Sequence, residues 1–270
     1  MSTLSLGYLT IAEATPSGIV AAAGRGGFHA TGARITGHRP GDAGPELVGN
    51  RDATAALRGA MRDFGVAIAN ISTYRFMPDT RPGDYDAVLD TMAELGVPVM
   101  VANCFTPDEG LAVANLAAVC ARAAPLSIRI ALEFIPVSNV KTVGQAAAMM
   151  ARTGMANAGL VVDALHLQRS GGTPADVAAV DPALLTAVQL CDAPLTAPAD
   201  LYAEMRGGRL NPGEGELPLF ALMDALPSGI EIEAEVPHAA RAGLPAEQRA
   251  RLAYDALQAF LVGYRAARAA

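Results

Sequence analysis

The sequence predicts an α/β protein that folds as a single (β/α)8 TIM barrel domain over residues 1–270. Three observations favour this fold: the length, a hydrophobic content of 51%, and eight short apolar runs that alternate with helical patterns. Eight such units match a closed barrel, which takes about 250 residues. The runs expected to form strands are Leu4–Leu9, Thr31–Gly37, Gly65–Ile71, Pro98–Asn103, Ser127–Phe134, Ala158–Ala164, Ala187–Cys191 and Gly229–Val236.

Five segments between these runs read as helices. Two of them place apolar residues at helical spacing, two are rich in alanine, and the last opens with a proline suited to a first turn. Strands that alternate with helices form parallel βαβ units, so we expect a parallel sheet. The expected helices are Asp52–Phe64, Tyr85–Leu95, Pro107–Arg122, Val143–Arg152 and Pro245–Arg268.

The competing architecture is an open, doubly wound sheet. Its usual signature is a glycine fingerprint directly after the first strand. The one glycine-rich turn of this kind, Gly24–Gly27, follows a helical pattern instead, and His29 stands where a third glycine would be needed. Repeat count and length therefore favour the closed barrel.

Composition excludes several classes of function. The net charge is −7 and the 20 Lys and Arg residues are dispersed, so we expect no nucleic-acid partner. The apolar stretches are too short to span a bilayer, no secretory signal is visible, and three separated cysteines do not form a disulfide framework. We expect a cytoplasmic protein whose partner is a small molecule. Its alanine-rich helices are compatible with a homodimer.

Polar residues follow the apolar runs in the second half of the chain, where the carboxyl ends of barrel strands carry function. Four consecutive runs each place an oxygen-bearing side chain near this end, and neighbouring strands lie only about 4.8 Å apart. Burying several carboxylates is costly unless a cation neutralises them, so this pattern indicates a divalent metal. The residues concerned are Glu133, Asp163, Gln189, Asp192, Glu231, Glu233 and Glu235.

The eighth run carries three glutamates that share one face of the strand. Because alternate residues of a strand point to the same side, this alternation does not show which of Glu231, Glu233 and Glu235 binds the metal. Only Glu235, which is nearest the end of the strand, lies at the height of the other candidates. We expect the other two to meet arginines such as Arg129 deeper in the barrel.

Five segments resemble the sugar isomerase/epimerase and endonuclease-IV-like superfamily, the xylose isomerase-like barrels. They fall mostly within residues 127–240 and occur in the order ALEFIP, VVDALHLQRSGG, VQLCDAP, RLNPGEGELP and IEAEVP. The resemblance implies one divalent metal held by Glu133, Asp163, Gln189 and Glu235. Family members usually carry histidine where this chain has Gln189. An all-oxygen set suits Mn²⁺ or Mg²⁺ best, with Co²⁺ or Zn²⁺ as further candidates.

The resemblance also implies roles for residues around the metal. His166 follows Asp163 by three positions and would contact substrate oxygens, while Arg209 would hold the substrate. Arg34, Tyr74 and Arg75, near the ends of the second and third strands, are candidates for lining the pocket. The other histidines have no ligand spacing and are interpreted as non-metal residues; they are His29, His38 and His238.

These features predict a metal-dependent isomerase or epimerase that acts on a small α-hydroxyketone, a ketose or keto-cyclitol. The metal would stabilise an enediolate as a Lewis acid, with Glu133 and Glu235 as base and acid. The first alternative is a lyase of the 3-dehydroshikimate dehydratase type, with His166 as proton donor and Arg34, Arg75 and Arg209 as candidates for binding the substrate carboxylate. The second is a non-catalytic ligand-binding barrel. An endonuclease would need more histidines than the four present.

Overall fold

Parallel strands close into a barrel in the order β1-β2-β3-β4-β5-β6-β7-β8 in the computed structural model, which describes residues 2–269. The register between β8 and β1 pairs Leu4 with Ile232 and so completes the ring. The strands are β1 (Leu4–Leu6), β2 (Ala30–Ala33), β3 (Ala67–Phe76), β4 (Val99–Cys104), β5 (Arg129–Glu133), β6 (Ala158–Asp163), β7 (Leu185–Leu190) and β8 (Glu231–Ala234). The predicted (β/α)8 barrel is confirmed.

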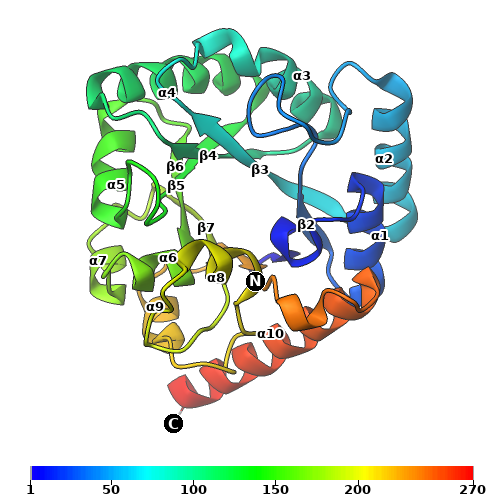
Figure 1. The fold of residues 1–270 in the computed structure, drawn as a ribbon, viewed down its shortest axis with the longest axis vertical. Helices are drawn as coiled ribbons and strands as arrows, with labels where there is room; N and C mark the ends of the chain where they lie inside the picture. Colours follow the sequence, from blue (N-terminus) through cyan, green and yellow to red (C-terminus); the bar gives the residue numbers. More distant parts are fainter. Residues whose placement is uncertain (1, 270) are drawn as a thin grey trace.

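Helices surround this ring of strands (Figure 1). They are α1 (Pro16–Gly26), α2 (Arg51–Phe64), α3 (Asp86–Leu95), α4 (Glu109–Ala123), α5 (Val143–Arg152), α6 (Ala164–Arg169), α7 (Pro174–Ala178), α8 (Leu201–Gly207), α9 (Leu219–Asp224) and α10 (Ala246–Ala269). Short 3-10 helices are η1 (Tyr8–Ile11), η2 (Pro82–Tyr85), η3 (Ala124–Leu126) and η4 (Ala239–Arg241). The five predicted helices correspond to α2, α3, α4, α5 and α10. Helices α6 to α9 span only five to seven residues each, too few for a periodic pattern to show.

Local chemistry explains where the long helices begin. The side chains of Asn50, Asp108 and Thr142 each accept a hydrogen bond from the backbone three residues on, at the starts of α2, α4 and α5. Such caps satisfy amide groups that the first helical turn leaves without partners. These three side chains therefore fix the residue at which α2, α4 and α5 begin.

Two apolar layers hold the barrel together. The larger layer lies between the strands and the helices, while a smaller cluster fills the inside of the barrel. The inner cluster consists of Val99, Val101, Ala131, Val161 and Ala187, all buried. Because the ring of strands is closed and this cluster fills part of its interior, a ligand site is expected at an end of the barrel.

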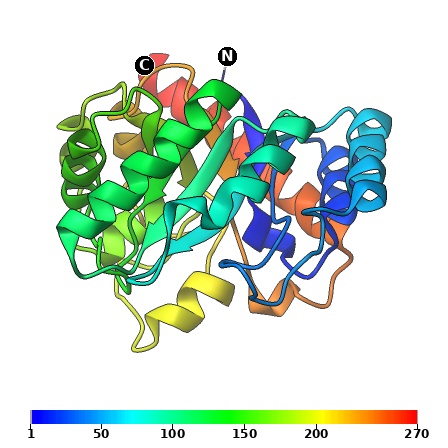
Figure 2. The same cartoon turned by 90° about the horizontal axis from the view of Figure 1, so that it is seen from above.

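The strands finish at the end of the barrel opposite both chain termini. Figure 2 shows α8, in yellow, projecting from this end, whereas the N- and C-terminal residues lie at the other. Strand β2 ends directly before Arg34, and β5 ends on Glu133. Strand β3 continues to Phe76, beyond the expected end at Ile71, so Tyr74 and Arg75 lie within it. The loops at this end are therefore those in which function was expected.

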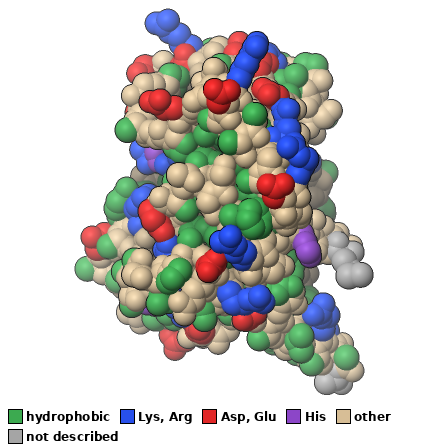
Figure 3. Space-filling model, turned by 90° about the vertical axis from the view of Figure 1, so that its right-hand side faces the viewer, with side chains coloured by type: hydrophobic (Ala, Val, Ile, Leu, Met, Phe, Trp, Pro, Cys, Tyr) green, Lys and Arg blue, Asp and Glu red, His purple; other side chains and the backbone are tan. Residues whose placement is uncertain are grey.

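Acidic and basic side chains are interspersed on the face shown in Figure 3. Surface ion pairs include Arg25 with Glu247 at 3.0 Å and Arg39 with Asp79 at 2.6 Å. Among the described residues, every helix is too short or too polar to cross a membrane.

Candidate active site

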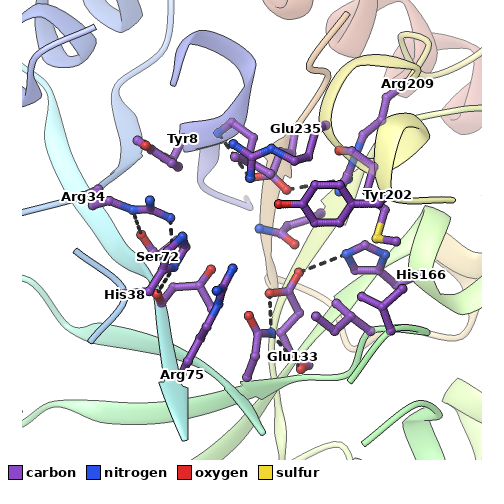
Figure 4. Close-up of a pocket in the computed structure, with 18 of the residues that line it drawn as sticks. Tyr8, Arg34, His38, Ser72, Arg75, Glu133, His166, Tyr202, Arg209 and Glu235 are labelled. Carbon is purple, nitrogen blue, oxygen red and sulfur yellow. Dashed lines mark hydrogen bonds and ion pairs between the residues drawn. The ribbon is translucent and has the colours of Figure 1, made fainter. Parts of the chain in front are cut away.

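A cavity of about 370 Å³ opens where the strands end. Its lining includes side chains from both halves of the barrel, and Figure 4 shows Arg34 and His38 facing His166 and Arg209 across it. Two of the predicted site residues, Asp163 and Tyr74, are not part of the lining. The predicted residues that do line it are Arg34, Arg75, Glu133, His166, Gln189, Arg209 and Glu235.

Glu133 stands at the end of β5 as a buried carboxylate beside a histidine. Its Oε2 accepts a hydrogen bond from Nδ2 of Asn103 at 2.9 Å, and its Oε1 lies 3.5 Å from Nε2 of His166. Burial, together with the negative charges of Glu235 and Asp163, raises the pKa of Glu133 to about 8. The site thus holds a carboxylate that will take up either a proton or a neighbouring cation.

Asp163 begins α6 and lies directly behind His166. Its Oδ1 accepts a hydrogen bond from the backbone amide of His166 at 2.9 Å, and Oδ2 pairs with Nη1 of Arg209. Burial by itself would raise the pKa of Asp163, but the Arg209 guanidinium and its other partners hold it below its usual value. Asp163 is therefore an ionised carboxylate with 0% exposure.

Arg209 lines the cavity and also pairs with carboxylates of the site. Its backbone lies between two loop bridges, which pair Asp192 with Leu210 and Gly208 with His238. The side chain is 1% exposed, and Nη1 also lies 3.6 Å from Oε2 of Glu235. Arg209 thus neutralises carboxylates of the site from behind, and only part of it reaches the cavity.

Glu235 follows β8 and faces the same cavity as Glu133. Its Oε1 accepts a hydrogen bond from the amide of Leu9 at 3.4 Å, and burial raises its pKa to about 8. Gly7 permits this position, because a Cβ atom there would lie 2.5 Å from Cβ of Glu235. The glycine at the end of β1 is thus a requirement of the site.

Gln189 is oriented by a carboxylate beneath it. Its Nε2 donates to Oε1 of Glu233 at 2.7 Å, and Nδ2 of Asn70 donates to Oε2 of the same glutamate at 2.5 Å. An amide turned the other way would set its oxygen against this carboxylate. Oε1 of Gln189 is consequently left buried without a hydrogen-bond partner among the described residues, which is the position of a ligand atom.

The expected pairing of the deeper glutamates with Arg129 is wrong. Glu231 accepts a hydrogen bond from Oγ of Ser5 at 2.6 Å, and Glu233 is satisfied by the two amides already described. Arg129 donates to the backbone oxygens of Ala158, at 2.8 Å, and Ala183. Neutral hydrogen-bond donors, rather than an arginine, meet these carboxylates.

The residues present fit a divalent cation. One oxygen each of Glu133 and Asp163 and one ring nitrogen of His166 lie within 4.8 Å of one another. The unpartnered oxygen of Gln189 and the raised pKa of Glu133 and Glu235 indicate the same need for positive charge. The geometry adds His166 to the oxygen set that the sequence indicated, so one nitrogen donor is also within reach.

The opposite wall carries arginines. Nε of Arg34 donates to the backbone oxygen of Ser72 at 3.3 Å, and Arg75 lies in β3 with its guanidinium over the ring of Phe105. Tyr74 packs against Tyr85, and its hydroxyl accepts from Oγ1 of Thr36 at 3.2 Å. Neighbours on a strand point to opposite faces, so Tyr74 enters the core where Arg75 enters the cavity. The expectation that Tyr74 lines the pocket is corrected.

Several lining residues were missed by sequence reasoning. They come from the loop after β2, from η1, from β4 and the residue after it, and from α8, and no motif marks their direction. His38 was assigned only as a non-metal residue; its Nδ1 lies 2.7 Å from the backbone oxygen of Thr73. Asn103 and Phe105 lie at the carboxyl end of the fourth strand, so their strand position could have predicted that they line the cavity. The other missed residues have no such signal. The missed residues include Tyr8, His38, Asn103, Phe105, Tyr202 and Arg206.

Fold and site together define a (β/α)8 barrel with a carboxylate-rich mouth. The chain belongs to the xylose isomerase-like TIM barrel family, whose model matches residues 20–260. No curated protein matches the sequence.

Solved structures with the same fold carry different activities. The IolI protein with bound zinc has a TM-score of 0.83 at 19% identity, covering 97% of this chain and 99% of that one. D-allulose 3-epimerase from Methylomonas sp., in complex with D-allulose, gives 0.71 at 15%, covering 95% and 96%. The probable 3-DHS dehydratase AsbF from Bacillus anthracis gives 0.71 at 13%, covering 96% and 99%. At these identities the likeness concerns the fold.

Proposed function

We propose that this protein is a divalent-metal-dependent isomerase or epimerase that acts on a small α-hydroxyketone, a ketose or keto-cyclitol. The observation that carries the proposal is that Glu133, Gln189 and Glu235 line one cavity beside the buried His166, with Asp163 of β6 buried next to them. The zinc in the IolI structure and the sugar in the epimerase structure support it by analogy.

Glu133, Asp163, Gln189 and Glu235 would hold the cation, with His166 in reach. A set dominated by oxygen favours Mn²⁺ or Mg²⁺ over Zn²⁺. When bound, the cation supplies Lewis-acid polarisation of the substrate carbonyl and the neighbouring hydroxyl. Glu233 holds the amide nitrogen of Gln189, so the amide oxygen would be available to a bound ion.

Glu133 and Glu235 would move the proton. They come from β5 and from the end of β8, so they approach a bound substrate from different sides of the barrel. One would remove the proton from the carbon between carbonyl and hydroxyl, and the other would return it. Burial lowers the pKa of His166 to about 4, so its ring is neutral near pH 7 and can share a hydrogen bond with a substrate oxygen.

Solvent exchange tests this function directly. Protein loaded with Mn²⁺ is incubated in D₂O with a panel of ketoses and keto-cyclitols, and the recovered substrates are examined by NMR. We expect deuterium at the carbon next to the carbonyl, and none after removal of the metal with EDTA. Metal binding with no exchange on any substrate would contradict the proposal and leave a ligand-binding barrel.

A lyase of the 3-dehydroshikimate dehydratase type is the second candidate. Nε2 of His166 lies 3.5 Å from Oε1 of Glu133, so a carboxyl group and a ring nitrogen that can exchange a proton stand side by side, as the proton transfers in the expulsion of a β-hydroxyl require. Growth of an aromatic ultraviolet band on incubation with dehydroshikimate would establish this reaction in place of the isomerase.

A further inference from the structure

Three arginines line the cavity without acidic partners. Arg34, Arg75 and Arg206 all contribute to its wall, and within residues 2–269 none of them forms an ion pair with an aspartate or glutamate. Arg209, the fourth arginine of the lining, pairs with Asp163. The chain carries more acidic than basic residues, so the lack of partners reflects their location and not a shortage of acids.

Each of these three guanidinium groups lies over an aromatic ring of the same cavity. Arg34 lies 4.7 Å from the ring centre of Tyr8, Arg75 lies 5.6 Å from that of Phe105, and Arg206 lies 5.8 Å from that of Tyr202. Stacking holds a guanidinium plane through its face and keeps its N–H edges available for hydrogen bonds. Among the described residues the edges of Arg75 and Arg206 have no partner. Arg34 uses Nε on the backbone oxygen of Ser72 and has Nη2 3.2 Å from Nδ1 of His38, which leaves its Nη1. Arg34 comes from the loop after β2, Arg75 from β3 and Arg206 from α8. The three side chains therefore present N–H donors to the same cavity.

The three positive charges are close enough to affect one another. The pKa of Arg34 lies below its usual value, mainly because of burial, and the charges of Arg206 and Arg75 lower it further. His38 adds no charge, since burial and Arg34 lower its pKa to about 4. Like charges gathered at a partly buried wall repel one another until an anion lies between them.

We propose that the substrate carries an oxyanion, a carboxylate or a phosphate, and that Arg34, Arg75 and Arg206 bind it. Guanidinium forks match both groups in geometry and charge. This inference rests on the proposed function for its claim that the ligand is the substrate. It narrows the substrate class from neutral ketoses to small acidic or phosphorylated α-hydroxyketones. A neutral polyol would leave the half-buried Arg34 and Arg75, and the exposed Arg206 beside them, without an anionic partner.

The two walls fix the direction in which such a molecule binds. Figure 4 shows Arg34 and His38 on one side of the cavity and His166 and Arg209 on the other. The oxyanion would lie at the arginine wall, which places the hydroxyketone carbons towards Glu133 and Glu235. Binding energy from the non-reacting group would thereby position the carbon that exchanges its proton.

Three probes with the same HOCH₂–CO– unit test the inference. Dihydroxyacetone is neutral, hydroxypyruvate adds a carboxylate, and dihydroxyacetone phosphate adds a phosphate. Binding is measured by calorimetry in EDTA, so that no metal contributes, and exchange of the hydroxymethyl protons with D₂O is measured after loading with Mn²⁺. We expect at least one anionic probe to bind about 10- to 100-fold more tightly than dihydroxyacetone, and the tighter anion identifies the group.

Arg75→Gln and Arg206→Gln are the test variants, and Arg265→Gln is the matched control. Arg265 is exposed on α10, lies outside the cavity lining and has no ion pair among the described residues, so its loss changes net charge alone. Each test variant should weaken binding of the anionic probe about 10-fold or more and leave binding of dihydroxyacetone unchanged, whereas the control should bind both as the wild type does.

The outcomes separate the two proposals. Equal binding of neutral and anionic probes, or equal losses in Arg75→Gln and Arg265→Gln, would overturn the oxyanion site even if proton exchange is seen. Arginine-dependent anion binding without exchange of any probe would support the oxyanion site and count against the isomerase.

Discussion

The two walls of the cavity differ in charge and in origin. The wall built from β5 to β8 gathers Glu133, Asp163 and Glu235 around one arginine, Arg209. The wall built from the ends of β2 and β3 presents Arg34 and Arg75 without an acidic partner in the described part of the chain, and Arg206 adds a third unpaired arginine from α8, between β7 and β8. One wall therefore carries more carboxylates than its single arginine can neutralise, and the other carries arginines without carboxylates. A cation on the first and an anionic group on the second would complete both, which is the arrangement expected for a metal-dependent enzyme with an acidic substrate.

Removing a carboxylate from the acidic wall should have the largest effect. Glu133→Gln keeps the shape of the side chain but cannot accept a proton, so we expect proton exchange to fall about 10²- to 10⁴-fold. Glu231→Gln is the control, because Glu231 is bonded to Ser5 deeper in the barrel and does not line the mouth cavity. Exchange within a few-fold of wild type in Glu133→Gln would refute the role given to this glutamate.

Removing the arginine of the acidic wall should cost stability. Arg209→Met leaves Asp163 buried without its cation, and we expect a loss of about 3–5 kcal/mol in urea unfolding measured in EDTA. Mn²⁺ should increase the free energy of unfolding of Arg209→Met more than that of the wild type, because the ion supplies positive charge to the same carboxylates. Arg169→Met, which breaks the buried pair with Glu204 outside the lining, should lose stability equally with and without Mn²⁺. Identical metal responses in the two variants would show that Asp163 is no ligand.

The acidic wall was predictable from the sequence for a physical reason. In a parallel barrel the ends of all strands meet, so an acidic or amide residue that closes an apolar run has its location fixed by the fold. Glu133, Gln189 and Glu235 were placed at the cavity in this way. The deeper glutamates were not, since their partners Ser5 and Asn70 lie on strands distant in sequence, and no pattern pairs them.

The basic wall was only half predictable. Arg34 and Arg75 follow from strand position, but Tyr74 did not, because the register between β3 and β4 shifts after Ile71 and the strand runs on. Arg206 and His38 come from a helix and a loop whose direction depends on tertiary packing. Arg209 lines the cavity as expected, but its ion pair with Asp163 could not be read from the sequence, because the two residues lie 46 positions apart.

Exchanging the neutral ligand of the acidic wall should change which metal binds. In Gln189→His one ring nitrogen can donate to Glu233 while the other faces the ion, as metal-bound histidines commonly do. We expect the ratio of Zn²⁺ to Mn²⁺ affinity to rise about 10-fold, measured by competition with a chelating dye. Unchanged competition curves would remove Gln189 from the ligand set.

The smallest expected effect lies in the basic wall, at His38. Its pKa is about 4 in the folded protein, because of burial and the charge of Arg34, against about 6.5 when unfolded. As pH falls from 6.5 towards 4 the unfolded chain takes up a proton that the folded chain refuses, so stability decreases with falling pH. His38→Gln should lose less stability than the wild type between pH 7 and pH 5, by about 1 kcal/mol or less, since solvent reaches part of the ring.

The same histidine reports on the charge of the wall. An anion between the arginines offsets the charge of Arg34, so saturating phosphate should raise the pKa of His38 from about 4, observed by NMR titration of its ring protons. The wild type would then lose less stability on acidification in phosphate than in chloride at equal ionic strength, and His38→Gln would respond alike to both salts. If phosphate does not change the pKa of His38, no anion binds near Arg34. The arginines of this wall would then give no reason to expect an acidic substrate.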